Sequence, residues 1–430
     1  MKNDLKLQNL KGTVDYLPKE QILREQIFST LKGVFEKYGF LPLDTAILCP
    51  FELLSSKYAG GAEILKEVYR LKDQGERDLG LRYDLTVPFS KTIAANQNIS
   101  LPFRRYEIGK VFRNGPVKLG RMREFYQCDV DVCGIEGRFI EVEFFQMALE
   151  GYNALGLDVE VKWNNRKYLS GLIEESGIPT EITLKSILAL DKLEKVGERE
   201  VEKELLELGC SKESAQKLFS LLSLPLNEVE KVATSNLLKE GICEVQEVQK
   251  LISELNLKDC VFSSTLARGL EIYTGTVWEI FDKTGKVKSS LGGGGRYDKI
   301  IGKFIDNGLE YPALGMSFGI EPIYVLLEEK QPEFNRVDLL IYAFDLNSKI
   351  LEIASALRKE GVNVIVDYKN KKLKKALEQA NSLKIPFVAI IGEDEIKENK
   401  IALKNMKDGT QVSLPILEAV KIIIKERKNG

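Results

Sequence analysis

Residues 103–133 read FRRYEIGKVFRNGPVKLGRMREFYQCDVDVC. Aromatic and β-branched side chains recur at near-alternate positions over 103–113 and again over 124–133, a spacing typical of β-strands. The intervening stretch Asn114–Gly120 contains two glycines and one proline, which predicts a loop. The sequence therefore predicts a long β-hairpin in this part of the chain.

Arginines are concentrated in this hairpin. Five of them fall within twenty residues: Arg104, Arg105, Arg113, Arg121 and Arg123. Arg113 ends the first predicted strand, and Arg121 and Arg123 lie where the second begins, so these three are expected to converge near the loop. Because guanidinium groups match phosphate oxygens with paired hydrogen bonds, the arrangement indicates a polyphosphate clamp. The alternative interpretation is a set of surface arginines on a sheet.

The second predicted strand carries polar side chains on one of its faces. Gln127, Asp129 and Asp131 are two residues apart, so they share a face. A buried amide and buried carboxylates need polar partners. The face is therefore expected to meet a ligand's amino group or a metal ion.

Composition limits the chemistry. The chain has 430 residues, which exceeds a single hydrophobic core and predicts two or three domains. It has 62 Lys and Arg, 64 Asp and Glu, a net charge of −2, and no histidine. The absence of histidine excludes Ser-His-Asp triads, Cys-His pairs, histidine general bases and His-containing zinc sites. Chemistry must run on arginine, lysine, carboxylates, hydroxyls, amides and a bound metal or cofactor.

Location follows from cysteine usage and hydropathy. None of the six cysteines forms a CxxC pair, which predicts reduced and mostly buried thiols in a cytoplasmic protein. The first ten residues lack the apolar centre of a signal peptide. No stretch approaches the ~18 apolar residues of a membrane span, so no membrane association is expected.

Changes in the pattern divide the chain. Residues 174–258 are rich in Glu, Lys and Leu at helical spacing, which predicts a helical insertion within a domain formed by 1–173 and 259–330. A polar stretch at 331–335 marks a boundary. Residues 336–430 then alternate strand and helix patterns, which predicts a separate α/β domain. This domain carries a net charge of +5, from 18 Lys and Arg and 13 Asp and Glu.

Further segments are weak signals alone. LRYDLTV (81–87) places Asp84 and Thr86 on one side of an extended segment. Strand patterns at 273–281 and 286–291 predict a second hairpin. The glycines at 292–295 lack the spacing of a phosphate-binding loop and predict a close-packed turn.

Seven segments together resemble one known family: KGTVDYLP (11–18), LRYDLTVP (81–88), RRYEIGKVFRNGP (104–116), GRMREFYQCDVDVCG (120–134), ARGLEIYTG (267–275), GGGRYD (293–298) and PALGMSFGIE (312–321). Along nearly its whole length the chain resembles the histidyl-tRNA synthetases, which are class II aminoacyl-tRNA synthetases. The resemblance implies an α+β fold, with an antiparallel sheet flanked by helices as the catalytic core at 1–173 and 259–330. It also implies that the insertion at 174–258 faces the tRNA and that 336–430 is an anticodon-binding-like domain.

The resemblance implies roles for histidine-binding residues. Asp84, Thr86 and Gln127 would hold the amino group of L-histidine. Asp131 and Tyr273 would bind its imidazole, with Tyr297 nearby. The implied histidine site therefore has six residues: Asp84, Thr86, Gln127, Asp131, Tyr273 and Tyr297.

The resemblance also implies an ATP site. Arg113 and Arg268 would contact the α-phosphate from two sides as the catalytic residues, and Arg121 and Arg123 would join them on ATP. Mg²⁺ would bridge the outer phosphates, and no side chain is assigned to the metal. The implied activity is ATP-dependent ligation of L-histidine to tRNA(His) through a histidyl-adenylate, in a homodimer.

Some positions depart from the family pattern. Pro322 stands where the third class II motif usually has an arginine, and Ala46 stands where the first motif usually has a proline. Pro322 favours the alternative, a non-catalytic paralogue such as the regulatory subunit of ATP phosphoribosyltransferase in histidine biosynthesis. The tail domain and the presence of both Arg113 and Arg268 favour the ligase. A third interpretation is a histidine-sensing RNA-binding protein without turnover.

Overall fold

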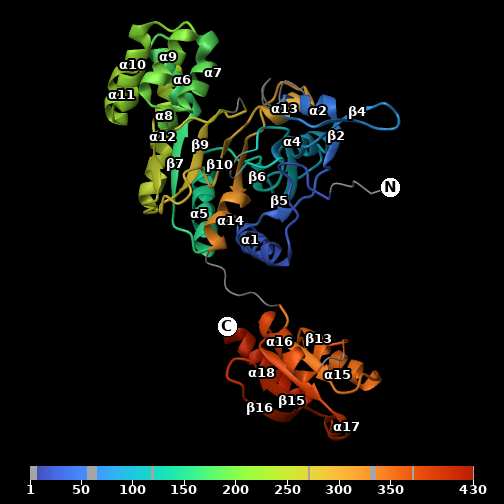
Figure 1. The fold of residues 1–430 in the computed structure, drawn as a ribbon. Coiled ribbons are helices and arrows are strands. Elements are labelled where there is room, and N and C mark those ends of the chain that lie inside the picture. The colour runs from blue at the N-terminus through green and yellow to red at the C-terminus, as the bar shows by residue number, and fades with distance from the viewer. Residues whose placement is uncertain are drawn as a thin grey trace. The chain divides into compact units, whose positions relative to one another are not determined.

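The computed structural model describes residues 7–55, 65–117, 121–269, 272–329, 336–369 and 372–429. The chain divides into two compact units, residues 1–330 and 331–430, which Figure 1 draws with the colour running from blue to red along the chain. The division falls beside the polar stretch at 331–335. Among the helices in these ranges, none combines the length and the hydropathy needed to span a bilayer.

A large sheet forms the centre of the first unit. Its strands within the described residues are β1 (Leu41–Pro42), β5 (Phe103–Phe112), β6 (Glu124–Cys133), β7 (Val159–Asn165), β8 (Cys260–Phe262), β9 (Thr276–Asp282), β10 (Gly292–Arg296) and β11 (Ala313–Gly319). Their order across the sheet is β1-β5-β6-β11-β10-β9-β7-β8. Neighbours are antiparallel except at the two edges, where β1 is parallel to β5 and β8 is parallel to β7. The predicted hairpin is confirmed as β5 and β6, paired from Phe103 and Cys133 to Phe112 and Glu124.

The glycine run at 292–295 corrects a prediction. It is not a turn but most of β10, and it lies between β9 and β11. A Cβ atom added at Gly294 would lie 2.1 Å from the Gly315 carbonyl oxygen and 2.6 Å from the Trp278 ring. The strand is therefore glycine-rich because its neighbours occupy the side-chain space, and packing overrides the low strand propensity of glycine. Residues 286–291, predicted as a strand, lie outside any strand, and β9 begins at Thr276 instead of 273.

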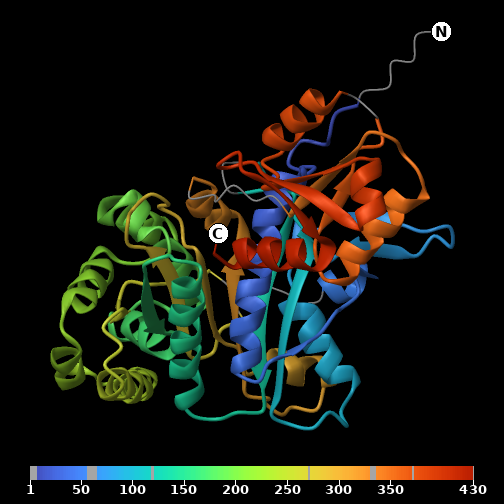
Figure 2. The ribbon, with the colours of Figure 1, turned by 90° about the horizontal axis from the view of Figure 1, so that it is seen from below.

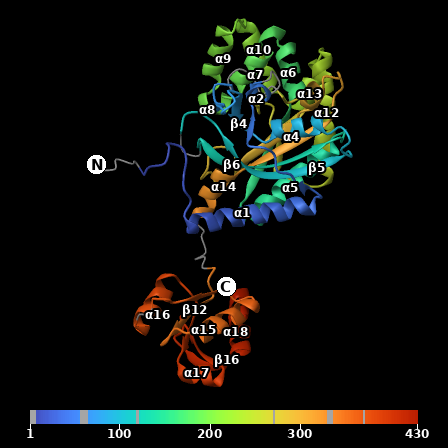
Figure 3. The ribbon, with the colours of Figure 1, turned by 90° about the vertical axis from the view of Figure 1, so that its right-hand side faces the viewer.

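Three helices cover one face of the large sheet. They are α1 (Pro18–Lys37), α5 (Phe139–Ala154) and α14 (Ile320–Glu328). Figures 2 and 3 show α1, in blue, running along this face, and Figure 3 shows α5 and α14 beside it. Ile27, Leu31 and Phe35 of α1 are fully buried there. They pack with the back-facing residues of the strands, such as Val130 and Phe318, in one core.

Smaller elements flank the other face. They are α2 (Phe51–Ser55), α4 (Thr86–Ala95), α13 (Ile300–Ile305) and a sheet of β2 (Leu48–Pro50), β4 (Asp78–Leu81) and β3 (Arg70–Lys72). They share a second hydrophobic cluster, which includes Leu54, Phe89 and Ile301. The first unit thus has an apolar layer behind the sheet and a smaller one beside its front.

The region between β7 and β8 is helical, as predicted. Its helices are α6 (Arg166–Glu175), α7 (Thr183–Leu190), α8 (Leu193–Val196), α9 (Glu198–Glu207), α10 (Lys212–Ser223), α11 (Leu226–Val232) and α12 (Asn236–Glu254), with a 3₁₀ turn at Thr180–Ile182. Figure 1 shows α7, α9 and α10 gathered beyond α6. The buried residues of these helices continue the core of the large sheet, so the helical insertion packs directly on that sheet.

Two glycines let α6 and α12 approach at backbone distance. A Cβ atom added at Gly241 would lie 2.2 Å from the Tyr168 nitrogen, and one added at Gly171 would lie 2.4 Å from the Leu238 Cα. Neither position has room for a side chain. The contact fixes α12 against α6.

The second unit is the predicted α/β domain. Its described elements are β12 (Leu339–Ala343), α15 (Ser348–Lys359), β13 (Val364–Val366), α16 (Leu373–Ser382), β14 (Phe387–Ile391), α17 (Glu393–Glu398), β15 (Lys400–Asn405), β16 (Gln411–Pro415) and α18 (Ile416–Asn429). The strand order is β13-β12-β14-β15-β16, with the first three parallel and the last two antiparallel. The short helix α17 was not predicted.

Candidate active site

The front face of the large sheet is built from glycine and polar residues at alternate positions. Strand register places Asp129 beside Glu107 and Ser317, and Asp131 beside Arg105 and Gly315. The glycines of this face form what we call the glycine floor: Gly109, Gly293, Gly295, Gly315 and Gly319. The same strands bury apolar side chains on the back face, so period-two alternation separates the core from the candidate site.

Side chains from two segments of the chain lie directly over the glycine floor. A Cβ atom added at Gly293 would lie 2.0 Å from Nη1 of Arg268, and one at Gly295 would lie 2.6 Å from the Tyr273 ring. One at Gly315 would lie 2.0 Å from Oδ1 of Asp131. The floor therefore brings Asp131 onto one face with Arg268 and Tyr273, which lie far from it in the sequence.

Asp131 is held by two neighbours. The Tyr297 hydroxyl donates a hydrogen bond to Oδ1, and Nη2 of Arg105 lies 2.6 Å from Oδ2 as an ion pair. Asp131 and Arg105 are both buried. Burial raises the pKa of Asp131, and the charge of Arg105 opposes that shift. Asp131 and Tyr297 are thus preorganised as one unit.

Gln127 and Asp129 present open acceptors on the same face. The Gln127 amide donates from Nε2 to Oγ of Ser317 at 3.4 Å. Its Oε1, like Oδ1 of Asp129, is buried and has no hydrogen-bond partner among the described residues. Burial, reinforced by the charge of Asp131, raises the pKa of Asp129 from 3.8 to about 8. Two buried acceptors without partners indicate a ligand that donates hydrogen bonds there.

Asp84 joins the site from the segment between β4 and α4. Its Oδ1 accepts a hydrogen bond from the Val87 backbone nitrogen at 3.0 Å. Burial raises the pKa of Asp84 to about 6, against the attraction of the Arg113 charge. The charges of Asp131 and Arg105 also act on it, so Asp84 lies within the same electrostatic cluster. Thr86 is the half-buried first residue of α4, two positions further on.

The two predicted catalytic arginines lie toward opposite sides of the floor. Arg113 follows β5, donates from Nε to the Tyr83 carbonyl oxygen at 3.1 Å, and lies 5.1 Å from the centre of the Phe125 ring. Arg268 donates from Nη1 to the Trp278 carbonyl oxygen at 2.9 Å, on the β9 side, and lies 5.5 Å from the centre of the Tyr273 ring. The side chain of Arg268 is 20% exposed, so its guanidinium keeps access to solvent.

Arg121 and Arg123 lie at the loop end of the hairpin, as expected from their spacing. The Arg113 nitrogen donates to the Arg123 carbonyl oxygen at 2.9 Å. Burial lowers the pKa of Arg113, and the charge of Arg121 adds to that shift. Arg121 pairs with Glu67 at 2.6 Å and is 47% exposed. The Arg121 guanidinium is thus accessible beside Arg113, whereas Arg123 is half-buried and donates from Nε to the Gly115 carbonyl oxygen at 3.4 Å.

The other two arginines of the hairpin do not join that group. Arg104 faces the helix layer and pairs with Glu143 at 3.0 Å. Arg105 pairs with Asp131 on the front face, one residue further along the strand. Alternation along β5 therefore separates neighbours in sequence onto different faces.

Sequence reasoning missed a buried charge network beneath the site. Arg82 contacts Glu107 at 2.7 Å, and Glu107 lies 3.5 Å from Arg105, with all three side chains buried. Period-two alternation along 103–113 places Arg105 and Glu107 on one face, which was the available signal. Nothing in the sequence spacing pointed to Arg82, which comes from another segment.

Pro322 lies at the edge of the floor. It is in the first turn of α14, and its Cγ would lie 2.9 Å from a Cβ atom added at Gly319. Gly319 is paired with Gln127 across β11 and β6. An uncharged ring therefore borders the candidate site where the family pattern has an arginine.

Comparisons with known proteins cover both units. A family model described as histidyl-tRNA synthetase matches residues 12–323, and one described as anticodon binding domain matches residues 335–426. The chain is 46% identical to histidine–tRNA ligase 1 of Bacillus thuringiensis subsp. konkukian, over 96% of this chain and 98% of that protein.

Solved structures are similar in fold. The crystal structure of histidyl-tRNA synthetase from Nostoc sp. PCC 7120 matches with a TM-score of 0.83 and 28% identity, over 98% of this chain and all of that one. A Bacillus halodurans structure, titled as an ATP phosphoribosyltransferase regulatory subunit/histidyl-tRNA synthetase, matches with a TM-score of 0.76 at 19% identity and shares the fold alone. These likenesses confirm the predicted α+β class II fold and the separate anticodon-binding-like domain.

Proposed function

The chain belongs to the histidyl-tRNA synthetase family, and we propose that it is a histidine–tRNA ligase. It would activate L-histidine with ATP as histidyl-adenylate and then transfer the histidine to tRNA(His). The observation that carries the proposal is the front face of the sheet, where unpartnered acceptors lie between Arg113 on one side and Arg268 on the other. The similarity to a histidine–tRNA ligase over nearly the full chain supports it.

Adenylation suits a protein without histidine. The substrate's carboxylate oxygen forms a bond to the α-phosphorus of ATP as the bond to pyrophosphate breaks. The nucleophile comes with the substrate, so the protein supplies positioning and charge neutralisation and needs no general base near neutral pH. Arg113 and Arg268 are assigned to the α-phosphate as the catalytic residues. In the transfer step the adenylate's own phosphate would accept the proton of the ribose hydroxyl.

The acidic side of the floor is assigned to L-histidine. Asp84, Thr86 and Gln127 would hold the amino group, and Asp131 and Tyr273 would bind the imidazole, with Tyr297 orienting Asp131. We add Asp129 to the amino-group site because its Oδ1 is buried and has no partner in the described part of the chain. An ammonium group offers three donors, which the open oxygens of this face would accept.

The loop end of the hairpin is assigned to the outer phosphates of ATP. Arg121 and Arg123 lie there beside Arg113, and Arg121 would exchange its exposed pair with Glu67 for a phosphate. Mg²⁺ supplies further charge neutralisation on these phosphates when bound. Within the described ranges no group of three or more acidic or thiol side chains is arranged to hold a metal.

The remaining parts are assigned to tRNA and assembly. The catalytic core at 1–173 and 259–330 would carry both chemical steps, with the insertion at 174–258 facing the acceptor arm. The domain at 336–430, with its charge of +5, would bind the anticodon arm. A cytoplasmic homodimer is the proposed form of the enzyme.

The proposal is tested by ATP–pyrophosphate exchange with purified protein. The expected result is exchange with L-histidine and no exchange with any of the other standard amino acids. Charging of tRNA(His) should follow. Histidine binding without exchange would instead support the regulatory paralogue, which Pro322 permits. Tight tRNA binding without ATP turnover would support the RNA-binding interpretation. The match of residues 335–426 to an anticodon-binding domain and the full-length similarity to a ligase disfavour the regulatory paralogue.

A further inference from the structure

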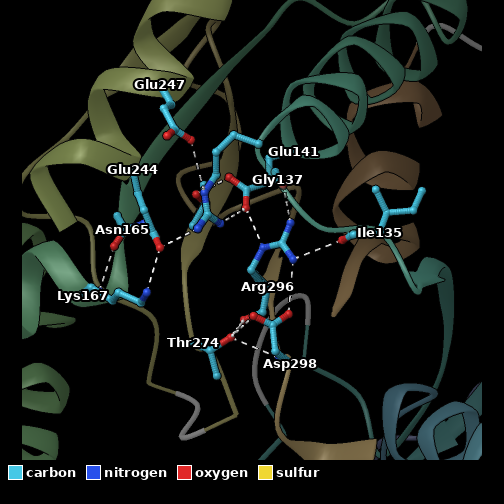
Figure 4. Close-up of polar contacts among 12 residues, drawn as sticks. Ile135, Gly137, Glu141, Asn165, Lys167, Glu244, Glu247, Thr274, Arg296 and Asp298 are labelled. Atoms are coloured by element: carbon cyan, nitrogen blue, oxygen red, sulfur yellow. Dashed lines mark hydrogen bonds and ion pairs between the residues drawn. The ribbon is translucent and has the colours of Figure 1, made fainter. Parts of the chain in front are cut away.

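A buried polar network lies beside the site, outside the residues assigned to substrates. Its centre is Glu141 of α5, which is fully buried. Oε1 of Glu141 accepts hydrogen bonds from Nη1 of Arg138 at 2.8 Å and from Nε of Arg296 at 2.7 Å, and Oε2 accepts one from the Thr276 hydroxyl. Figure 4 shows Glu141 between Arg296 below and the helical insertion above. One carboxylate thus joins α5 to the start of β9 and the end of β10.

The helical insertion enters this network mainly through Glu244 of α12. Oε1 of Glu244 lies 2.5 Å from Nη2 of Arg138 and 2.9 Å from Nζ of Lys167, and Oε2 accepts a hydrogen bond from Nδ2 of Asn165 at 2.6 Å. The Glu244 side chain is 11% exposed. Arg138 therefore bridges two buried carboxylates, one on the core helix and one on the insertion.

The other end of the network holds the segment that carries Tyr273. The Thr274 nitrogen donates to the Arg296 carbonyl oxygen at 2.8 Å, and the Thr274 hydroxyl accepts from the Asp298 nitrogen at 3.1 Å. Thr276, which donates to Glu141, follows two residues later. The backbone on the C-terminal side of Tyr273 is therefore fixed by Arg296 and Glu141.

The start of α6 holds the same segment from the insertion side. The Arg166 nitrogen donates to the Gly275 carbonyl oxygen at 2.8 Å, and its Nη1 donates to the Arg268 carbonyl oxygen at 3.2 Å. Asn165, which caps α6, is also the residue that donates to Glu244. Because α12 approaches α6 at backbone distance at Gly241, the two helices are fixed relative to each other and so are these contacts.

We propose that Glu244 is a positioning residue for adenylation. Through Arg138 and Glu141 on one side and Asn165 on the other, it makes the helical insertion set the positions of Tyr273 and Arg268 over the glycine floor. Glu244 touches neither substrate. The inference rests on the proposed function, because its readout is histidine activation, and a shift of α12 would be transmitted to the chemical site by these contacts.

The test compares two substitutions on one helix. Glu244→Gln removes the charge that Arg138 and Lys167 share, whereas Glu247→Gln removes a 64% exposed carboxylate 4.0 Å from the same arginine. In ATP–pyrophosphate exchange with the full chain, Glu244→Gln is expected to lower kcat about tenfold and to raise the KM for histidine, as expected when a reacting group is misplaced. Glu247→Gln should stay within about twofold of wild type, since exposed ion pairs contribute little.

A second variant reports on the route of the effect. Thr276→Val removes the hydroxyl that Glu141 accepts from, at the far end of the network. It is expected to give the same fall in kcat, and its effect should not add to that of Glu244→Gln, because both act through one network. It also tests the proposal if Glu244→Gln does not fold.

Two results would overturn the proposal. One is a Glu244→Gln protein with a lowered melting temperature but wild-type kcat and KM. That result would show that Glu244 has a structural role only. The other is full additivity of Glu244→Gln and Thr276→Val in kcat. Exchange by the wild-type protein in the same assay separates failure of this inference from failure of the proposed function.

Discussion

The two sheets of this protein use their faces differently. Strands β12 and β14 of the second unit, LLIYA and FVAII, are buried at every position, with apolar clusters on both sides. Strands β6 and β11 of the first unit bury apolar residues along one face. On the other face they place Gln127, Asp129 and Asp131 or glycines, with apolar packing only at the strand ends Cys133 and Ala313 among the described residues of these two strands. A parallel sheet covered on both faces needs apolar side chains throughout.

The difference locates the chemistry. In the second unit both faces are committed to packing, so any binding must use strand ends, loops or helices. In the first unit the middle of one face carries polar side chains and glycines, and it holds buried polar atoms without partners in the described part of the chain, such as Oδ1 of Asp129. Buried polar groups of this kind are costly unless a ligand satisfies them. This cost in stability is the one expected if, as we propose, the open face binds the substrates.

The largest effect is expected from Arg268→Ala. Removing the guanidinium that we assign to the α-phosphate should lower kcat of histidine-dependent exchange about 1,000-fold, roughly 4 kcal/mol of transition-state stabilisation. The melting temperature should change little, because the side chain makes one hydrogen bond and a 3.8 Å ion pair.

A matched control uses the opposite face of the same sheet. Arg104 pairs with Glu143 on the helix side and is 24% exposed. Arg104→Ala should leave kcat within about threefold of wild type, since partly exposed ion pairs contribute little. A comparable loss of kcat in both variants would contradict the assignment of the front face to catalysis.

Most of the contrast between the two sheets could be predicted from the sequence. Alternation over 103–133 was enough for the hairpin and for the shared face of Gln127, Asp129 and Asp131, because side-chain direction in a strand has a fixed period. Alternation was also enough for the α/β order of the second unit.

Other features were beyond reach of local patterns. The strand at 292–296 was predicted as a turn because glycine freedom is a local property, whereas the exclusion of a Cβ at Gly294 comes from Gly315 and Trp278 on neighbouring strands. The buried charge contacts of Arg82, Glu141 and Glu244 were not predicted either, because they depend on residues distant in the sequence. Their partners lie 25, 155 and 106 positions away, at Glu107, Arg296 and Arg138.

A packing substitution in the second unit tests its separation from the chemistry. Ile341 of β12 is fully buried. Ile341→Ala should destabilise this unit by about 3 kcal/mol, from lost burial and a cavity. Chemical denaturation followed by circular dichroism would show the lost stability as an unfolding transition at a lower denaturant concentration. ATP–pyrophosphate exchange at low temperature should remain within about twofold of wild type, because the proposed adenylation site lies wholly in the first unit. A proportional loss of exchange would show that the units are coupled.

Asp129→Asn should separate function from stability. Losing the carboxylate should lower kcat/KM for histidine about 100-fold, roughly 2.7 kcal/mol, because an ammonium loses a charge-assisted partner. The same change should raise the stability of the ligand-free protein at pH 8 by about 1–2 kcal/mol, since a buried unpaired charge is removed. Thermal melts with and without histidine would measure both effects. Loss of stability together with loss of activity would indicate a structural role for Asp129.

The pH dependence has a defined sign. In the folded protein the pKa of Asp84 is raised to about 6 and that of Asp129 to about 8, from 3.8 in each case. The folded chain therefore binds protons more tightly than the unfolded chain, and these groups lower the free energy of unfolding as pH rises from ~4 to ~8. Histidine affinity should instead increase from pH 6 to pH 8, because the ammonium binds the ionised carboxyls. Calorimetric titration of Asp129→Asn should show a smaller increase than wild type.

The smallest effect is expected from adding a methyl group to the glycine floor. In Gly315→Ala the new methyl group would lie 2.0 Å from Oδ1 of Asp131, so this side chain must move away from its ideal contact with Tyr297. The KM for histidine should increase about tenfold, with kcat nearly unchanged, because substrate binding and the transition state lose the same contact. Ala389→Gly in β14 is the reverse exchange at a fully buried position of the other sheet. It should cost about 1 kcal/mol of stability and leave KM unchanged, since a glycine there only adds backbone freedom and a small void. If Gly315→Ala lowered stability alone, the glycine floor would be a packing device like the strands of the second unit, and the contrast between the two sheets would lose its functional meaning.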